Sequence, residues 1–373
     1  MTASPPPPSP ASALAGPRSP AVERLLAGFD ARLPAALARA VSLVENQRDG
    51  FDALLAALHP RIGRARRIGI TGPPGAGKST LTTQLTKAYR AAGLTVGIVA
   101  VDPTSPFTGG ALLGDRIRME DVALDPGVFI RSLATRGSLG GLSSATRVVA
   151  DVLDAFGFDR ILLETVGVGQ SELDIARAAD STLVVLVPES GDSIQTLKAG
   201  LMEIADLFAV NKADRPGADR VRNDIELMLG MRSGMGLRNV PAHHGVDLGA
   251  IANPARAARI AAQGEQQEQW LPPVLRTVAA EGEGIAELVD ALDRHFRYLG
   301  ASGELTRRRR ARWREQILEV AEQRLRRRVW GDPAIQAFIE ASLPGVEAGS
   351  STPFGIADEL LQRGAGILTR TGT

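Results

Sequence analysis

The segment best suited to chemistry is a glycine-rich loop at residues 72–79, GPPGAGKS. It fits the pattern G-x-x-x-x-G-K-[ST], whose glycines let the backbone approach a phosphate closely and whose N–H groups can surround it. Lys78 would neutralise charge on the β- and γ-phosphates, and the Ser79 hydroxyl would be a magnesium ligand. The residues expected to contact a nucleotide here are Gly72, Pro73, Pro74, Gly75, Ala76, Gly77, Lys78, Ser79 and Thr80.

The flanks of this loop distinguish a phosphate site from a glycine-rich turn that only caps a helix. An apolar run typical of a strand, Arg67–Thr71, precedes the loop, and a helical pattern, Lys78–Ala92, follows it. Because a phosphate-binding loop connects a strand to a helix, both flanks favour nucleotide binding.

A second motif, Asn211-Lys212-Ala213-Asp214, directly follows the apolar run Leu207–Val210. An aspartate at this place can accept hydrogen bonds from N1–H and the exocyclic amine of guanine. Adenine lacks that pair of donors, so a carboxylate here would disfavour ATP. Alone, the tetrapeptide could be an N-capping turn before a helix; downstream of the phosphate loop it predicts guanine specificity.

A carboxylate follows a third apolar run, Ile161–Leu163. The segment Glu164–Gly167 is similar to the D-x-x-G element of GTPases, with glutamate in place of aspartate. Glu164 would contact magnesium directly or through water, and the Gly167 N–H would sense a γ-phosphate. Val168 stands where Ras-like GTPases carry a water-orienting glutamine, so we expect slow unassisted hydrolysis.

Two more acids are candidates for the magnesium and hydrolysis site. Asp102 ends the apolar run Thr95–Val101, and Asp115 follows a loop with two glycines and three hydroxyl residues that suits a mobile switch. From spacing alone, Asp102 could equally form an Asx-Pro turn and Asp115 could cap a helix over 116–122.

Strand-like and helical patterns alternate from Arg67 to about Leu299. Continuous apolar strands separated by helices predict an α/β P-loop NTPase fold, with a mostly parallel central sheet covered by helices on both faces. Ligands of such sheets bind beyond the carboxyl ends of the strands, where every motif above falls. Further strand candidates are Val128–Arg131, Thr182–Val187 and Val274–Thr277.

Together these residues resemble the MeaB/ArgK-type GTPases, which accompany adenosylcobalamin-dependent methylmalonyl-CoA mutase. The resemblance spans about Arg39 to Leu299. Besides the phosphate loop, it is carried by residues 38–45 (ARAVSLVE), 101–106 (VDPTSP), 114–119 (GDRIRM), 164–172 (ETVGVGQSE) and 270–274 (WLPPV).

The resemblance implies how the candidate residues would be used. By matching motif positions, Lys78, Asp102, Asp115 and Glu164 would form the hydrolysis site, with magnesium held by Ser79 and the three acids. GTP or GDP would be the bound nucleotide, and the chain itself would bind no cobalamin. Val278 and Ala279 would flank the base, although valine replaces the usual serine. Residues 191–198 would match an additional switch loop of the family. Without the resemblance, these residues favour an ordinary connection between a strand and a helix.

Four regions are predicted along the 373 residues. Residues 1–20 hold seven prolines and predict a disordered tail, and 21–62 form an N-terminal helical segment. Residues 63–300 form the GTPase domain, including a loop-rich stretch at 232–269. Residues 301–373 form a C-terminal helical region in which only a short helical pattern, Ile356–Leu361, follows Pro344. The resemblance implies that this region mediates homodimerisation.

Composition excludes several other classes of protein. The chain has no cysteine, which excludes disulfides and thiolate metal sites. Its net charge is +1, which argues against a surface that is generally coated by bound polyanions. An arginine-rich helix at 307–328 could bind nucleic acid, but its interleaved glutamates favour a solvated helix in a dimer. No apolar run approaches the ~20 residues of a membrane span. We therefore expect a cytoplasmic protein that binds neither nucleic acid nor membrane.

The resulting hypothesis is a magnesium-dependent GTPase that acts as a chaperone for an adenosylcobalamin-dependent acyl-CoA mutase, of the methylmalonyl-CoA or isobutyryl-CoA type. It would gate cofactor loading and protect the mutase. Two alternatives remain open: an ATP-dependent kinase of a basic amino-acid transport system, and a metallochaperone GTPase. The latter would give a role to His243-His244, which are better explained as exposed loop histidines.

Overall fold

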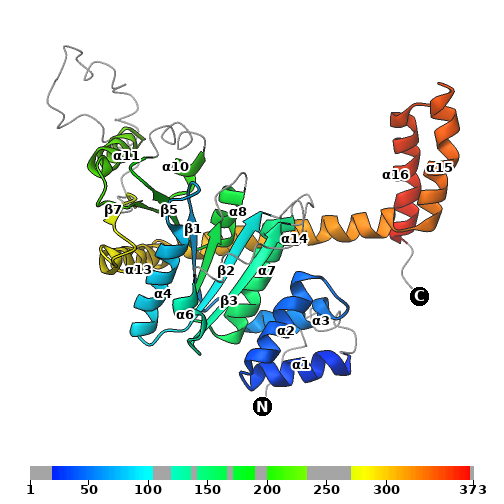
Figure 1. Cartoon of the computed structure of the whole chain (residues 1–373). Coiled ribbons are helices and arrows are strands. Elements are labelled where there is room, and N and C mark those ends of the chain that lie inside the picture. The colour runs from blue at the N-terminus through cyan, green and yellow to red at the C-terminus, as the bar shows by residue number, and fades with distance from the viewer. Residues whose placement is uncertain are drawn as a thin grey trace, which may run out of the picture. The chain divides into compact units, whose positions relative to one another are not determined.

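The centre of the molecule is a seven-stranded sheet of order β3-β2-β4-β1-β5-β6-β7, in which every pairing is parallel (Figure 1). The computed structural model describes residues 19–103, 119–135, 141–165, 171–189, 200–232 and 270–369. The strands are β1 Arg66–Thr71, β2 Val96–Pro103, β3 Val128–Thr135, β4 Arg160–Thr165, β5 Ser181–Leu186, β6 Leu207–Asn211 and β7 Val274–Thr277.

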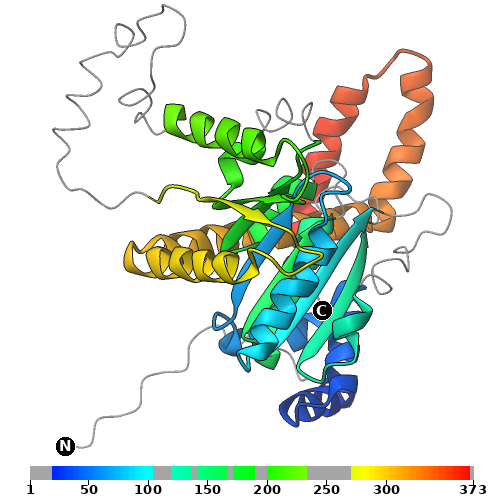
Figure 2. The same cartoon turned by 60° about the vertical axis from the view of Figure 1, so that its left-hand side comes forward.

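Helices cover both faces of this sheet (Figure 2). Alternate residues of a strand point to opposite faces. Accordingly, Leu163 of β4 packs in one apolar cluster with the N-terminal helices, α7 and α8, while Leu162 packs in another with α4 and α13. The predicted parallel sheet with helices on both faces is therefore confirmed. The helices connected to the sheet are α4 Lys78–Ala91, α6 Glu120–Ala123, α7 Gly141–Phe156, α8 Ser171–Ala178, α10 Met202–Ile204, α11 Ala218–Arg232 and α13 Ile285–Ala301.

Three short helices precede the sheet: α1 Pro20–Asp30, α2 Pro34–Glu45 and α3 Phe51–Leu58. Ser19 caps α1 by accepting a bond from the Val22 N–H, and proline opens both α1 and α2, where its missing N–H costs nothing. Leu37 and Val41 of α2 are completely buried in the cluster that contains α7. This apolar stripe attaches the N-terminal helices to the domain.

A buried polar network fixes the entry into β1. The Asp154 carboxylate accepts bonds from the N–H groups of Gly63, Arg64 and Ala65 at 2.8, 3.1 and 2.9 Å, and from the Arg67 guanidinium at 3.1 Å. Burial lowers the pKa of Arg67, but Asp151, Asp154 and Asp180 outweigh it and raise that pKa above its ordinary value. The strand leading to the phosphate loop is thereby held against α7.

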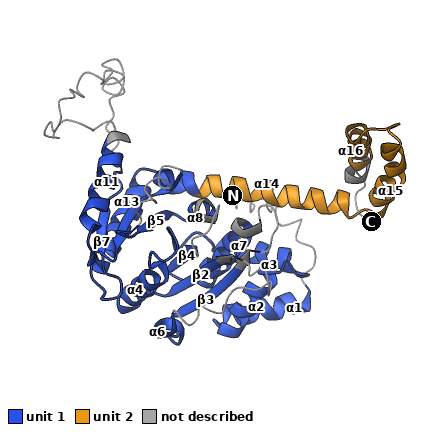
Figure 3. Cartoon of the chain, turned by 45° about the horizontal axis from the view of Figure 1, so that its top comes forward, with its two compact units in different colours: residues 1–308 blue, residues 309–373 orange. Residues whose placement is uncertain are grey.

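The chain divides into two compact units, residues 1–308 and 309–373 (Figure 3). Helix α14, Glu304–Trp330, begins in the first, and the second also contains α15, Pro333–Glu347, and α16, Pro353–Thr369. The predicted boundary between residues 300 and 301 stays a prediction.

The C-terminal tail is more helical than expected. Instead of the short pattern Ile356–Leu361, the whole of α16 is helical, and α15 continues through Pro344 to Glu347. Asp332 caps the start of α15, and Gly349, at a φ of 72°, follows its end. The Arg363 guanidinium lies 4.0 Å from the centre of the Phe338 ring, so α16 packs on α15. Among the described helices, none combines the length and apolarity that a membrane crossing needs.

Candidate nucleotide site

The predicted phosphate loop lies between the last residue of β1 and the first residue of α4. Gly72, Gly75 and Gly77 have φ values of 139°, 74° and 85°, which side chains disfavour. A Cβ on Gly72 would lie 2.0 Å from the Val185 carbonyl oxygen, and one on Gly77 would lie 2.4 Å from the Asn211 amide nitrogen. Glycine is therefore favoured by the backbone at all three positions and also by close neighbours at Gly72 and Gly77.

The ammonium group of Lys78 lies inside this loop. Its Nζ donates to the carbonyl oxygens of Gly72 at 2.7 Å and Pro73 at 2.9 Å, and the side chain is buried. Lys212 donates across the loop to the Gly75 carbonyl at 2.8 Å. Two positive charges are thus held at the backbone where a phosphate would lie, which suits binding of a polyanion.

Two oxygen groups meet beside the start of α4. The Ser79 hydroxyl donates to Glu164 Oε1 at 2.5 Å, and Glu164 is almost fully buried at the end of β4. A hydroxyl and a carboxylate are the hard oxygen ligands that magnesium prefers, so this pair fits the predicted metal site. Among described residues, no group of three or more His, Cys, Asp or Glu gathers as a metal cluster.

The other predicted acids are only partly covered by the structure. The backbone of Asp102 lies in β2, paired with Ala134 of β3, and its side chain lies outside the described residues. Asp115, Gly167, the switch-like loop before Asp115, the 191–198 loop and His243-His244 also lie outside them. Their predicted roles stay predictions.

Asn211, the last residue of β6, connects its own strand to the phosphate loop and to the end of β7. Its amide Nδ2 donates to the Ala76 carbonyl at 2.8 Å, and its Oδ1 accepts from the Ala279 N–H at 3.0 Å and the Thr277 hydroxyl at 3.2 Å. The Ala213 N–H also donates to the Thr277 carbonyl at 3.1 Å. These bonds bring the phosphate loop and the ends of β6 and β7 together.

Around this junction lie the predicted base-contacting residues. Asp214 is exposed in the turn after β6, Ala279 is buried, and Val278 pairs with Glu283 in a short bridge. The Ala279 N–H is bonded to Asn211 and not to a base, so the predicted base contact of Val278 and Ala279 stays a prediction. Thr277 was not predicted as a site residue. The available signal was its place at the end of β7, which pairs with β6, the strand that leads into the Asn211–Asp214 motif.

Comparison with known proteins decides the family. A family model described as "Methylmalonyl Co-A mutase-associated GTPase MeaB" matches residues 37–334. The chain belongs to the MeaB family of GTPases. It is a GTPase that binds guanine nucleotides, and the predicted family is confirmed.

Relatives of this MeaB-family GTPase cover most of its length. A protein of Pyrococcus horikoshii whose name includes the word GTPase is 46% identical over 301 residues, covering 80% of this chain and 84% of the relative. "GTPase ArgK" of Escherichia coli is 33% identical over 323 residues, with 86% and 89% covered. "Methylmalonic aciduria type A homolog, mitochondrial" of Mus musculus is 31% identical over 355 residues, with 91% and 79% covered.

A solved structure supports the same fold. A protein described as "LAO/AO transport system kinase" is 26% identical, with a TM-score of 0.60, and the match covers 93% of this chain and 99% of that one. The fold of the MeaB-family chain is thus that of a P-loop NTPase.

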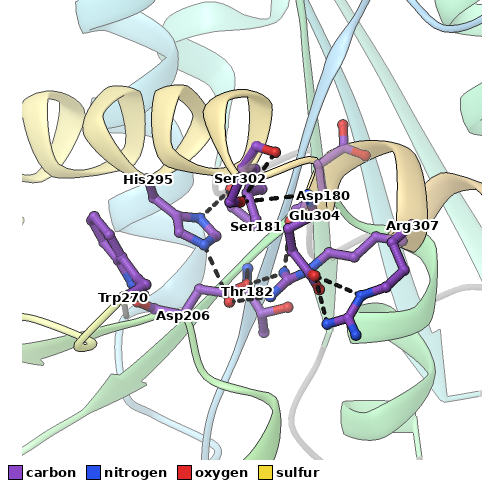
Figure 4. Close-up of polar contacts among 11 residues, drawn as sticks. Asp180, Ser181, Thr182, Asp206, Trp270, His295, Ser302, Glu304 and Arg307 are labelled. Carbon is purple, nitrogen blue, oxygen red and sulfur yellow. Dashed lines mark hydrogen bonds and ion pairs between the residues drawn. The ribbon is translucent and has the colours of Figure 1, made fainter. Parts of the chain in front are cut away.

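Away from the nucleotide motifs, this MeaB-family GTPase contains a buried charged cluster that the sequence did not predict (Figure 4). We call Asp206, His295, Trp270 and Arg308 the Asp206 cluster. Arg308, in the first turns of α14, donates to both carboxylate oxygens of Asp206 at 2.8 Å. His295 Nε2 lies 3.3 Å from Asp206 Oδ1, and the Trp270 indole N–H donates to the Asp206 carbonyl at 2.8 Å. The cluster fastens α13 and the start of α14 to the amino end of β6.

The Asp206 carboxylate is stabilised in its charged form. Burial raises its pKa, but His295 and Arg308 lower it, and the net pKa lies below the ordinary 3.8. A lowered folded-state pKa gives stabilisation that is complete above the ordinary carboxyl pKa and is lost as pH falls through the folded-state value. The cluster therefore contributes fully at neutral pH and fails only in acid.

Asp206→Ala is expected to lower the free energy of unfolding by about 2–3 kcal/mol, measured by urea denaturation at pH 7. It leaves the Arg308 guanidinium, which is one-third exposed, with Glu304 as its remaining carboxylate partner, and it leaves the Thr182 N–H without its acceptor. The matched control is Asp290→Ala, which removes an exposed pair with Arg294 on α13 and should change stability by less than about 0.5 kcal/mol. Equal effects of the two variants would contradict a structural role for the cluster.

Proposed function

We propose that this GTPase hydrolyses GTP at the carboxyl edge of the sheet with magnesium as cofactor. The contact that carries the proposal is the bond between Ser79 and the buried Glu164 at 2.5 Å, because it puts two magnesium-type ligands beside the phosphate loop. When bound, magnesium would neutralise charge between the β- and γ-phosphates. Ser79 would exchange Glu164 for the metal, and Glu164, Asp102 and Asp115 would hold it directly or through water.

The other residues would bind and orient the nucleotide. Lys78 would leave the carbonyls of Gly72 and Pro73 to contact phosphate oxygens, and the N–H groups of the loop would hold the remaining charge. Asp214 would accept two bonds from guanine, and Asn211 would keep the base loop against the phosphate loop. Gly167 would respond to the γ-phosphate, so that loss of this phosphate on hydrolysis would release the segment next to Gly167.

We propose further that the GTPase cycle serves an adenosylcobalamin-dependent acyl-CoA mutase. The support is the description of the family as mutase-associated and the name of the mouse relative. In this role the chain would gate loading of the cofactor and protect the mutase, with the nucleotide state controlling the contact between the proteins. The cobalamin would stay with the mutase.

The residue Val168 makes this partnership testable by GTP turnover. Since valine cannot orient water as a glutamine does, we expect the partner to supply the missing assistance. GTP turnover by the purified chain should rise at least about tenfold when methylmalonyl-CoA mutase or isobutyryl-CoA mutase is added. Lys78→Ala mixed with the mutase is the control for contaminating GTPase. Equal turnover with and without either mutase would contradict partner activation.

The second unit would assemble two copies of the chain. Its helix α14 exposes Ile317, Leu318 and Leu325, whose exposed fractions are 67, 55 and 49%, and such apolar side chains are typical of a surface that another protein covers. We therefore propose homodimerisation through the predicted C-terminal region, residues 301–373, which sedimentation of the full chain would measure.

The kinase alternative keeps one specific support, the description of the solved relative as a transport-system kinase. It requires ATP binding, so competition of GTP and ATP for the site distinguishes the two functions.

A further inference from the structure

Two buried threonine hydroxyls meet where the phosphate loop and the Glu164 segment leave the sheet. Thr71 is the last residue of β1, and Gly72 follows it; Thr165 is the last residue of β4, directly after Glu164. Both side chains are completely buried. Thr165 Oγ1 donates to Thr71 Oγ1 at 3.1 Å.

This bond lies one residue beyond the backbone pairing of the two strands. The register of β1 with β4 runs from Arg66–Arg160 to Ile70–Glu164, and Thr71–Thr165 is the next position. At that position the strands begin to diverge, because Gly72 turns the chain into the phosphate loop with a φ of 139°. The hydroxyl pair therefore continues the link between the strands where the backbone pairing stops.

Packing alone does not explain these two hydroxyls. Valine has the same shape as threonine, and the neighbouring strand β5 ends with the apolar Leu186. A buried hydroxyl costs free energy unless it is hydrogen-bonded, whereas a buried methyl group does not. What the hydroxyl pair provides over two valines is a directional bond that fixes the separation and register of the strand ends.

The phosphate loop is thus attached to the end of β4 at both of its own ends. Before the loop, Thr71 bonds to Thr165; after it, Ser79 bonds to Glu164 at 2.5 Å. The second bond is the one that magnesium would displace from Ser79. The first joins two hydroxyls that have no contact with nucleotide or metal in the proposed site, so we expect it to persist through the cycle.

We infer that the Thr71–Thr165 pair is a positioning device that keeps Glu164 aligned with the phosphate loop when Ser79 turns to magnesium. The inference rests on the proposed magnesium site. Thr165 acts through the adjacent Glu164 and Thr71 through the adjacent Gly72. Misalignment of a metal-contacting carboxylate by a fraction of an ångström impairs the transition state more than nucleotide binding, so the effect belongs in kcat and in the magnesium requirement.

The experiment compares Thr165→Val, Thr165→Ser and the double variant Thr71→Val/Thr165→Val by steady-state GTP hydrolysis at a series of magnesium concentrations. We expect Thr165→Val to lower kcat about tenfold and to raise the magnesium concentration for half-maximal activity several-fold, while KM for GTP changes less than about threefold. Thr165→Ser, which keeps the hydroxyl, should restore both within about twofold. The double variant should unfold at the wild-type urea concentration yet remain slow, because it removes both polar partners together.

The matched control is Thr86→Val. Thr86 is equally buried, and its hydroxyl bonds to the Thr82 carbonyl at 2.7 Å within α4, away from the strand ends. It should leave kcat and the magnesium requirement within about twofold of the wild type. This separates a general cost of removing a buried hydroxyl from an effect at the loop.

Two results would overturn the inference. One is a Thr165→Val or double variant whose kcat and magnesium requirement stay within twofold of the wild type. The other is a Thr165→Ser variant as slow as Thr165→Val, which would assign the effect to the methyl group. If Thr165→Val does not fold, the double variant decides in the same way. Wild-type turnover that needs no magnesium would overturn the proposed metal site and this role with it; magnesium-dependent wild type with an unaffected double variant would overturn the inference alone.

Discussion

Lys78→Ala should reduce kcat/KM for GTP by about 10²- to 10³-fold. The side chain is buried inside the phosphate loop, and its ammonium group lies 2.7 and 2.9 Å from two loop carbonyls, where phosphate oxygens would replace them. Truncation removes the buried one of the two positive charges at the loop, since Lys212 remains, and does not alter the glycines that shape the loop. Phosphate release under saturating and limiting GTP would give kcat and kcat/KM separately.

The matched control for this variant is Lys87→Ala. Lys87 lies on the same helix, α4, but is exposed and pairs with Asp121 at 2.6 Å. Its removal should leave kcat/KM within about twofold. If Lys78→Ala kept more than a tenth of wild-type activity, the loop would hold phosphate without the Lys78 charge, and the assigned role of Lys78 would be wrong.

The second large effect concerns the choice of base. Asp214→Asn is expected to weaken GTP binding about 10³-fold or more relative to the wild type, because an amide can accept only one of the two guanine N–H bonds and presents a donor to the other. The same amide complements xanthine, whose oxygen replaces the exocyclic amine, so xanthosine triphosphate should become the preferred nucleotide. Competition among labelled GTP, xanthosine triphosphate and ATP measures both changes.

An exposed aspartate nearby supplies the control. Asp219 lies in the first turn of α11 and pairs with Arg276 at 2.9 Å, without a predicted contact to the base. Asp219→Asn should leave the nucleotide preference unchanged. An unchanged ratio of GTP to ATP affinity in Asp214→Asn would show that Asp214 does not read the base and would favour the kinase alternative.

Features that depend on local pattern were predictable from the sequence. The apolar runs before Gly72, Glu164 and Asn211 became β1, β4 and β6, because a strand buried on both faces needs a continuous apolar segment. The phosphate loop carries its own conformational signal in its glycines. Since parallel strands present their carboxyl ends at one edge, the motifs after those strands could be placed together without further information.

Features that depend on contacts between distant residues were not predictable. Asp206 and Arg308 are 102 residues apart, and Thr71 and Thr165 are 94 apart, with no periodic pattern linking either pair. The length of α16 was underestimated because its glycines and the preceding Pro344 weaken the helical signal locally, while packing on α15 supplies the compensation. Asp102 and Asp115 remain predictions since their side chains lie outside the described residues.

The junction made by Asn211 has a consequence during synthesis of the protein on the ribosome. Its partners Ala76 and Ala279 lie 135 residues before it and 68 residues after it. The chain leaves the ribosome with its N-terminus first, so the phosphate loop and the turn at Asn211–Asp214 emerge well before Ala279 does. A nascent chain that stops short of β7 contains every residue of the two motifs but lacks the Ala279 N–H that holds the Asn211 side chain. We therefore expect full guanine-nucleotide affinity only late in synthesis, when the GTPase unit is almost entirely made.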